Sequence, residues 1–340
     1  MTRMNRRAVV GLACAALTCG ALARAPATSR PVFRHAQDGP EPRRRAARAA
    51  PAFYVTRAAS TLVDYGLAAP APTGTEAAAF QQVPTPGVRV LPNVARATNL
   101  PWVDSNGWRF QRGIQKANYA KLPAGSASLA AAEAFTFNVD AILNPDPADI
   151  EELGKMLRFL KALDQPRLPV LANIGVVDDR SPPMSEVLNM LTRRNLLYRI
   201  VSAPDRRLDL TVQLGTQDFP TEAAANPSEF AARVRAKLGD DRRLVRLYGT
   251  STVIAHLTGD GKRAQLYLLG YGGNRRLQSA GQQAVRVRLL GRYQPAGVSA
   301  YGAAQAGDAA LTDLRNPGNT TEFWVPDFNI CAIVDLDALK

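Results

Sequence analysis

Three helix-start signals alternate with short apolar runs between residues 139 and 247, and this alternation limits the possible folds most strongly. Each signal is a capping residue followed by proline, at Asp146-Pro147, Ser181-Pro182 and Asn226-Pro227. The capping side chain accepts a hydrogen bond from a free N–H of the first turn, and proline fits the first helical position. Apolar residues such as Leu153 and Met156 then recur at helical spacing, so we expect a helix after each signal.

The apolar runs between these helices show no alternation of polar and apolar residues, and they cover 139–143, 169–177, 196–201 and 208–214. Unpatterned strands that alternate with helices are typical of a parallel sheet that is covered on both faces. We therefore predict an α/β domain over residues 102–247, with a mostly parallel sheet and helices on both faces.

Helix signals stop after Tyr248. Two strand-like runs, Thr252–Leu257 and Arg263–Leu269, flank an Asp260-Gly261 dipeptide, which is a strong hairpin signal. Further strand-like runs cover 283–290, 321–325 and 329–336. Several short strands in about ninety residues predict a C-terminal antiparallel β-sandwich over 248–340.

The N-terminus predicts export. Residues 1–27 combine a basic start, an apolar run over 8–23 and small-residue cleavage sites, which together are typical of a secretory signal peptide. The apolar run is shorter than the roughly 20 residues of a spanning helix, so we expect no stable membrane insertion after cleavage. The Arg6-Arg7 pair suggests a twin-arginine route. The protein is thus expected to be periplasmic or secreted.

The next segment, 28–101, is rich in Ala, Pro and Arg and is expected to be largely disordered or irregular. Short strand-like runs occur within it at 53–55 and 88–91.

Much of the basic charge lies near the N-terminus, because residues 1–60 carry eleven Arg against two acids. The other 280 residues carry 31 bases and 27 acids, and this near balance argues against a nucleic-acid partner.

Polar side chains follow two of the predicted strands. Asn144 and Asp146 come after one run, and Asp178 and Asp179 come after another. Ligands of open α/β sheets bind beyond the carboxyl ends of the strands. Asp178 and Asp179 could therefore act as general acid and base, or hold a hard cation together with Asn144. The alternative is that these side chains only cap helices and make turns.

A second concentration of polar and aromatic residues lies at the start of the predicted α/β domain. Trp102, Asp104, Asn106 and Trp108 would suit a sugar, with aromatic faces on C–H surfaces and polar groups on hydroxyls. The alternative is an entry turn with both Trp side chains in the core. Glu133 lies in a helical run and is expected to be an exposed surface carboxylate.

The sequence lacks the motifs of several other kinds of catalytic or metal site. Gly-x-Ser-x-Gly and metal patterns built on His or Cys are absent, and no cofactor motif occurs. The two histidines are His35, in the irregular segment, and His256, in a predicted strand. Cys331 is the one cysteine beyond the signal peptide, and its apolar surroundings predict a buried, inert thiol.

Residues 171–179 and 185–201 form a strand–helix–strand pattern, and 321–326 and 332–336 form closing strands. In this order of parts the chain resembles the accessory half of bacterial beta-galactosidase-type glycoside hydrolases. In that family an amidotransferase-like α/β domain precedes a small C-terminal β-domain. No Cys or His occupies an elbow within 102–247, so the resemblance implies a degenerate amidotransferase-like domain. A catalytic barrel needs about 250 residues, and we expect none within this chain.

These observations favour an exported, non-catalytic protein that is carbohydrate-associated or a scaffold. One alternative is a glycoside hydrolase-like enzyme whose paired carboxylates, about 5–9 Å apart, come from Asp104, Asp178, Asp179 or Glu186. Another alternative is a structural subunit whose α/β domain mediates homo-oligomerisation.

Overall fold

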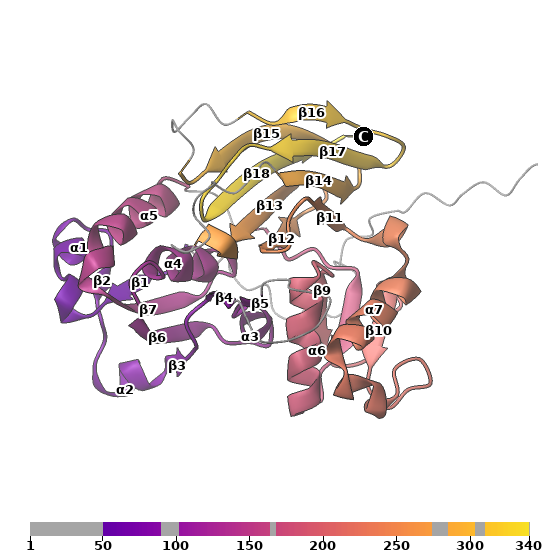
Figure 1. Cartoon of the computed structure of the whole chain (residues 1–340), viewed down its shortest axis with the longest axis horizontal. Coiled ribbons are helices and arrows are strands. Elements are labelled where there is room, and N and C mark those ends of the chain that lie inside the picture. Colours follow the sequence, from indigo (N-terminus) through magenta and orange to yellow (C-terminus); the bar gives the residue numbers. More distant parts are fainter. Residues whose placement is uncertain (1–49, 90–101, 164–167, 274–284, 303–309, 340) are drawn as a thin grey trace, which may run out of the picture. The chain divides into compact units, whose positions relative to one another are not determined.

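The computed structural model describes residues 50–89, 102–163, 168–273, 285–302 and 310–339 (Figure 1). The predicted signal peptide, the Arg6-Arg7 pair and His35 lie outside these residues. Among the described residues, no helix is long and apolar enough to cross a bilayer.

The first parallel sheet, sheet A, has the strand order β2-β1-β7-β6-β3. Three short helices and two longer ones belong to this part of the chain: α1 (Thr61–Asp64), α2 (Gly74–Ala78), α3 (Gly107–Gln111), α4 (Ala127–Thr136) and α5 (Ile150–Ala162). The strands are β1 (Phe53–Val55), β2 (Ala69–Pro70), β3 (Gln81–Gln82), β6 (Lys116–Leu122) and β7 (Asp140–Pro145).

Sheet A differs from the sequence prediction in where it starts. The segment 28–101 is predicted to be largely irregular, yet its residues 53–82 supply three of the five strands. Strand β1, at one of the two predicted strand-like runs, lies between β2 and β7 inside the sheet. The prolines shorten the elements without preventing pairing, since β2 and β3 have two residues each. At the other run, β4 (Gly87–Arg89) pairs with β5 (Trp102–Asp104) as an antiparallel ribbon.

A separate parallel sheet, sheet D, has the order β10-β8-β9. Its strands are β8 (Ile174–Val177), β9 (Tyr198–Val201) and β10 (Leu210–Gln213), and its helices are α6 (Pro182–Arg193) and α7 (Pro227–Leu238). The predicted α/β fold is confirmed, but the parallel strands form two sheets where the sequence predicts one.

The three predicted helix starts are confirmed by their capping geometry. The Asp146 side chain accepts from the N–H of Ala148 at the start of the 3-10 turn η2 (Pro147–Asp149), which leads into α5. Ser181 and Asn226 cap α6 and α7 in the same way, each with proline at the first helical position. The remaining 3-10 turns are η1 (Arg57–Ala59), η3 (Thr221–Ala225), η4 (Asp240–Arg242) and η5 (Tyr271–Gly273).

The predicted C-terminal β-sandwich is also confirmed. Its sheets are antiparallel: sheet C has the order β12-β13-β18-β15, and sheet E has the order β11-β14-β17-β16. The strands are β11 (Val245–Tyr248), β12 (Val253–Gly259), β13 (Arg263–Gly270), β14 (Val285–Leu290), β15 (Tyr293–Ala300), β16 (Thr312–Arg315), β17 (Thr320–Val325) and β18 (Cys331–Ala338).

Apolar side chains of both sheets fill the space between them, including Leu266, Val287, Phe323 and Val334. The other face of sheet C is not free, because its Tyr267, Leu269 and Ile333 share a core with α4 and sheet A. Cys331 lies on this face and is buried, and burial raises the pKa of its thiol to about 12. The predicted burial of this thiol is therefore confirmed.

Asp240 in η4 gives a pH-dependent contribution to stability. Nε and Nη2 of Arg235 donate to its two carboxylate oxygens, each at 2.7 Å. Hydrogen bonding to Arg235 is the main reason why the pKa of Asp240 falls from 3.8 to about 2. The side chain is 37% exposed, so the ion pair is screened by solvent.

We expect Asp240→Asn to lower the free energy of unfolding by about 1 kcal/mol at neutral pH. Because the pKa is lower in the folded chain, the carboxylate stabilises the fold above the unfolded pKa of 3.8, and this contribution is lost as the pH falls through about 2. Urea unfolding of both proteins at several pH values should show a constant difference above pH 5 that shrinks below pH 4. A difference that does not change with pH contradicts this assignment.

Candidate functional site

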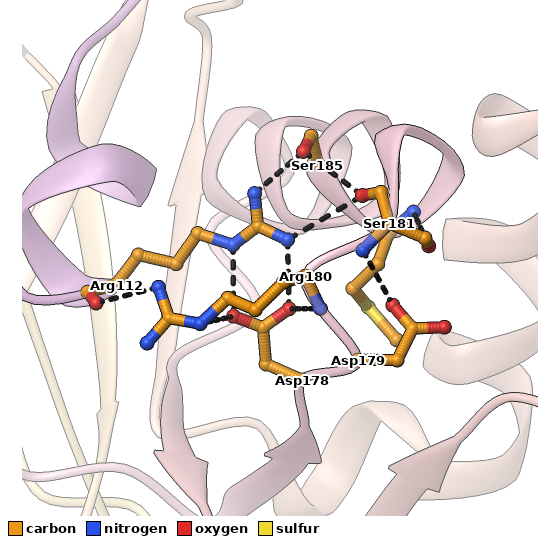
Figure 2. A network of polar contacts seen from close by, with 7 residues as sticks. Arg112, Asp178, Asp179, Arg180, Ser181 and Ser185 are labelled. Carbon is orange, nitrogen blue, oxygen red and sulfur yellow. Dashed lines mark hydrogen bonds and ion pairs between the residues drawn. The ribbon is translucent and has the colours of Figure 1, made fainter.

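The turn between β8 and α6 holds Asp178 and Asp179, and Figure 2 shows that the two carboxylates face different partners. Nε and Nη2 of Arg112 donate to the two oxygens of Asp178 at 2.8 and 2.7 Å. The Asp178 side chain is only 1% exposed, and that of Arg112 is 12% exposed. Asp179 instead accepts from the N–H of Ser181 at 2.9 Å, which shapes the turn before α6.

The surroundings of Asp178 favour its ionised form. Burial alone would raise its pKa, but hydrogen bonds from Arg112 and from the N–H of Arg180, with both guanidinium charges, hold the pKa below its usual value. Arg112 also donates to Ser185 on α6 at 2.5 Å. The network therefore joins the C-terminal end of α3 to the start of α6 (Figure 2). These contacts support the capping and turn-making alternative for Asp178 and Asp179.

Asn144 and Asp146 lie at the carboxyl edge of sheet A, whereas Asp178 and Asp179 follow β8 of sheet D. Asn144 accepts from the hydroxyl of Thr56 at 2.8 Å and donates to the carbonyl of Ala120 at 2.7 Å. The cation site that would combine Asn144 with Asp178 and Asp179 draws on two different sheets. No cluster of three or more His, Cys, Asp or Glu side chains that could hold a metal occurs in the described part of the chain.

Asp104 and Glu186 have different surroundings. Asp104 on β5 forms an ion pair with Arg89 of the neighbouring strand, and Nη2 of Arg89 donates to it at 2.8 Å. Glu186 is exposed on α6, and its charge acts on Arg109 and Arg193. Asp104 and Asp178 are thus each paired with an arginine.

Both tryptophan rings of the predicted sugar-binding segment carry a guanidinium on one face. The guanidinium carbon of Arg193 lies 3.7 Å from the ring centroid of Trp102. That of Arg109 lies 4.2 Å from the centroid of Trp108, which is buried in the core between α3, α6 and α7. This packing supports the alternative in which the tryptophans are part of the core.

Asn106, the remaining residue of that segment, is buried and belongs to a network that sequence reasoning missed. Its backbone N–H donates to Oε1 of Glu133 at 2.7 Å, and its Nδ2 donates to Oε2 at 3.0 Å. Tyr119 also donates to Oε2 at 3.0 Å, while Ser105 and Tyr271 donate to Oε1 at 3.1 and 2.7 Å. Glu133 is fully buried and accepts five hydrogen bonds.

The exposed position expected for Glu133 is wrong, because α4 is buried on all sides. All ten residues of α4 are buried, and the helix contacts β6 and β7 of sheet A and β13 of sheet C. Burial raises the pKa of Glu133, although the surrounding donors oppose this shift. Burial and the charge of Glu133 in turn raise the pKa values of Tyr119 and Tyr271 well above normal. Since Tyr271 follows β13, the carboxylate links sheet A to the sandwich.

A pocket of about 330 Å³ lies on sheet C, next to a bulge of β15 between Pro295 and Gly297. Its polar lining comes from neighbouring strands that place Arg263 opposite Asp337 and Gln265 opposite Asp335. Nε2 of Gln265 donates to Oδ1 of Asp335 at 2.9 Å. Leu168, Ala264, Ala296 and Leu336 complete the lining. The pocket therefore offers donors and acceptors together with a small apolar surface.

No family model matches the chain, and no curated protein matches it in sequence. Several solved structures match parts of the chain. Alpha-L-fucosidase isoenzyme 2 from Paenibacillus thiaminolyticus matches with a TM-score of 0.47 and 10% identity, over 64% of this chain and 57% of that one. Gan42B, a GH42 beta-galactosidase from G. stearothermophilus, matches with a TM-score of 0.35 and 7% identity, over 76% and 53%.

A beta-galactosidase from Rahnella sp. R3 matches with a TM-score of 0.30 and 11% identity, over 75% of this chain and 54% of that one. The chain thus spans little more than half the length of these solved structures. The structural resemblance to these proteins is weak, with TM-scores of 0.30–0.47 and identities of 7–11%.

Proposed function

We propose that the chain is an exported protein that binds carbohydrate and does not cleave it. The observation that carries this proposal is the pocket on sheet C, whose Arg263, Asp335 and Asp337 can pair with sugar hydroxyls. Its volume of about 330 Å³ falls in the range of ligand pockets, which is roughly 300–1,000 Å³. Export to the periplasm or the medium is part of the proposal and rests on the signal-like residues 1–27.

The absence of cleavage is proposed from the surroundings of the carboxylates. A general acid in glycoside hydrolysis needs an environment that keeps it protonated, such as an apolar pocket. Asp178 and Asp104 are instead paired with arginines, and Asp335 accepts from Gln265. Asp337 is exposed and stands opposite Arg263. For Asp178, hydrogen bonds from Arg112 and from the N–H of Arg180, with both guanidinium charges, hold the pKa below its usual value, which disfavours a general acid at that position.

The proposal is tested by titrating the full chain with linear neutral pentasaccharides of glucose, xylose, mannose and galactose. We expect at least one of them to bind, and Asp337→Asn to weaken that binding by about fivefold or more while the melting temperature stays unchanged. Asp241→Asn is the matched control, because Asp241 is 97% exposed and lies outside the pocket. Equal affinities of Asp337→Asn and wild type for every bound sugar would exclude the pocket as the binding site.

Two alternatives give different results. A glycoside hydrolase-like enzyme releases new reducing ends from the bound oligosaccharide. A purely structural subunit binds none of the four sugars and sediments as a stable oligomer, with α/β domains in contact.

A further inference from the structure

The outer face of sheet E carries a group of side chains that the pocket does not use. Along β11, β14 and β17 the core-facing residues alternate with outward-facing ones, as the burial of Val245, Val287 and Phe323 shows. The intervening outward positions form what we call the sheet E ladder, which comprises Arg246, Tyr248, Arg286, Arg288, Glu322 and Trp324.

The strand register arranges the ladder in two cross-strand rows. In one row Arg286 lies between two aromatic residues, with Tyr248 opposite it on β11 and Trp324 opposite it on β17. The Arg286 guanidinium carbon is 5.6 Å from the Tyr248 ring centroid. Tyr248 is 37% exposed and the Arg286 side chain is 44% exposed, so a solute can reach this row.

In the other row Arg246 stands directly opposite Arg288, which in turn stands opposite Glu322. Like charges directly opposite each other on a sheet repel, so this pair of arginines depends on nearby carboxylates. Glu322 pairs with both Arg286 and Arg288, while Asp240 and Asp241 approach Arg246 and Arg288 at 3.8 and 3.9 Å.

Glu322 does not saturate these guanidinium groups. Nη1 of Arg288 is buried and has no hydrogen-bond partner among the described residues. The ladder itself holds three arginines and one glutamate, which gives it a charge of +2. Arg286 is the most exposed arginine of the ladder; it pairs with Glu322 through Nη2 and lies beside the partly exposed rings of Tyr248 and Trp324. A guanidinium next to aromatic rings can bind a planar anion attached to an apolar surface.

We propose that the sheet E ladder binds a linear oligosaccharide of uronic acids. The sugar rings would pack on Tyr248 and Trp324, and the carboxylates would bind the arginines. Neighbouring strands lie about 4.8 Å apart, so three strands span roughly 10 Å, which is comparable with a disaccharide. The site lies on a different sheet from the pocket and takes a charged ligand, so it does not depend on the proposed binding of neutral sugars.

The test is a titration of the full chain with tetragalacturonate, with maltotetraose as the neutral comparison. We expect Arg286→Gln to weaken tetragalacturonate binding by about tenfold, because it removes a charge-assisted, two-point contact. Arg286→Lys, which keeps the charge, should still lose several-fold, and Tyr248→Ala should lose about threefold or more. Binding should also weaken when NaCl is raised from about 50 to about 200 mM.

Arg207→Gln is the matched control, because Arg207 is an exposed arginine outside the ladder whose partner is Asp205. It should bind tetragalacturonate within about twofold of wild type. An equal loss in Arg207→Gln and Arg286→Gln would overturn the site, since it would indicate general attraction to a basic protein. Equal affinity for a sulfated tetrasaccharide or for single-stranded DNA of the same charge would overturn the uronate assignment. Failure of wild type to bind tetragalacturonate overturns the proposal, whatever the pocket variants show for neutral sugars.

Discussion

Replacing Glu133 by alanine is expected to lower the free energy of unfolding by about 3–5 kcal/mol, which is at the upper end for a single substitution. The change removes the acceptor for five hydrogen bonds and leaves Ser105, Asn106, Tyr119 and Tyr271 with fewer partners in a buried site. Glu133→Gln should cost less, about 2 kcal/mol, because one acceptor oxygen remains. Urea unfolding followed by circular dichroism measures both values.

Glu151→Ala on the neighbouring helix α5 is the control for this prediction. Its carboxylate is 82% exposed and pairs with Lys155 in the next turn, so its loss should leave the urea midpoint close to that of wild type. If Glu133→Ala lowers the free energy of unfolding by less than about 1 kcal/mol, the buried network does not hold sheet A and the β-sandwich together.

Replacing Asp178 by alanine has the second largest expected effect, again about 3–5 kcal/mol. The variant would leave the guanidinium of Arg112, which is 12% exposed, without its two-point carboxylate partner between α3 and α6. Removal of one partner of a buried ion pair costs more than the pair contributes, because the other charge remains desolvated. Thermal and urea unfolding of the purified variant measure the loss.

This result separates a structural role of Asp178 from a catalytic one. If Asp178 is a general acid or base, Asp178→Asn should abolish turnover and leave stability almost unchanged. The contacts with Arg112 predict instead a clear loss of stability in both Asp178→Asn and Asp178→Ala. Asp241→Ala, at a residue that is 97% exposed, should stay within about 0.5 kcal/mol of wild type and serves as the control.

The helices after Asp146, Ser181 and Asn226 could be predicted because their signals are local. A capping side chain and a proline act within one turn, so the sequence alone contains the interaction. The Asp260-Gly261 hairpin is local in the same sense: Asp260 accepts from the N–H groups of Lys262 and Arg263 at 2.9 and 2.8 Å. The alternation of strands with helices, and then the run of short strands, was enough to predict both fold classes.

The arrangement of the parallel strands could not be predicted in the same way. Pairing of β1 with β7 joins residues 88 positions apart, and nothing local distinguishes that pairing from one with β8. The proline-rich composition around β1 indicated irregular structure, whereas burial of Val55 against the core of sheet A determined the outcome. Composition describes a segment by itself, but a two- or three-residue strand is stabilised by its neighbours.

The sequence around Glu133 contains one signal that this residue is buried. It is the only charged residue between Lys121 and Asp140, in a helix that is otherwise made of small and apolar residues. A helix that is apolar on all sides is typically buried, so a lone glutamate within it should be expected to have buried partners. Those partners come from β6, the α3 turn and η5, which the sequence alone does not bring together.

We propose that the pocket on sheet C binds a neutral oligosaccharide without cleaving it. The most direct measurement incubates the full chain with the tightest-binding pentasaccharide, and follows bound sugar and new reducing ends in the same sample. We predict saturable binding that Asp337→Asn weakens, with reducing ends no higher than in a sugar-only blank. Release of reducing ends by wild type, and its loss in Asp337→Asn, would contradict binding without cleavage and identify the pocket as a hydrolytic site.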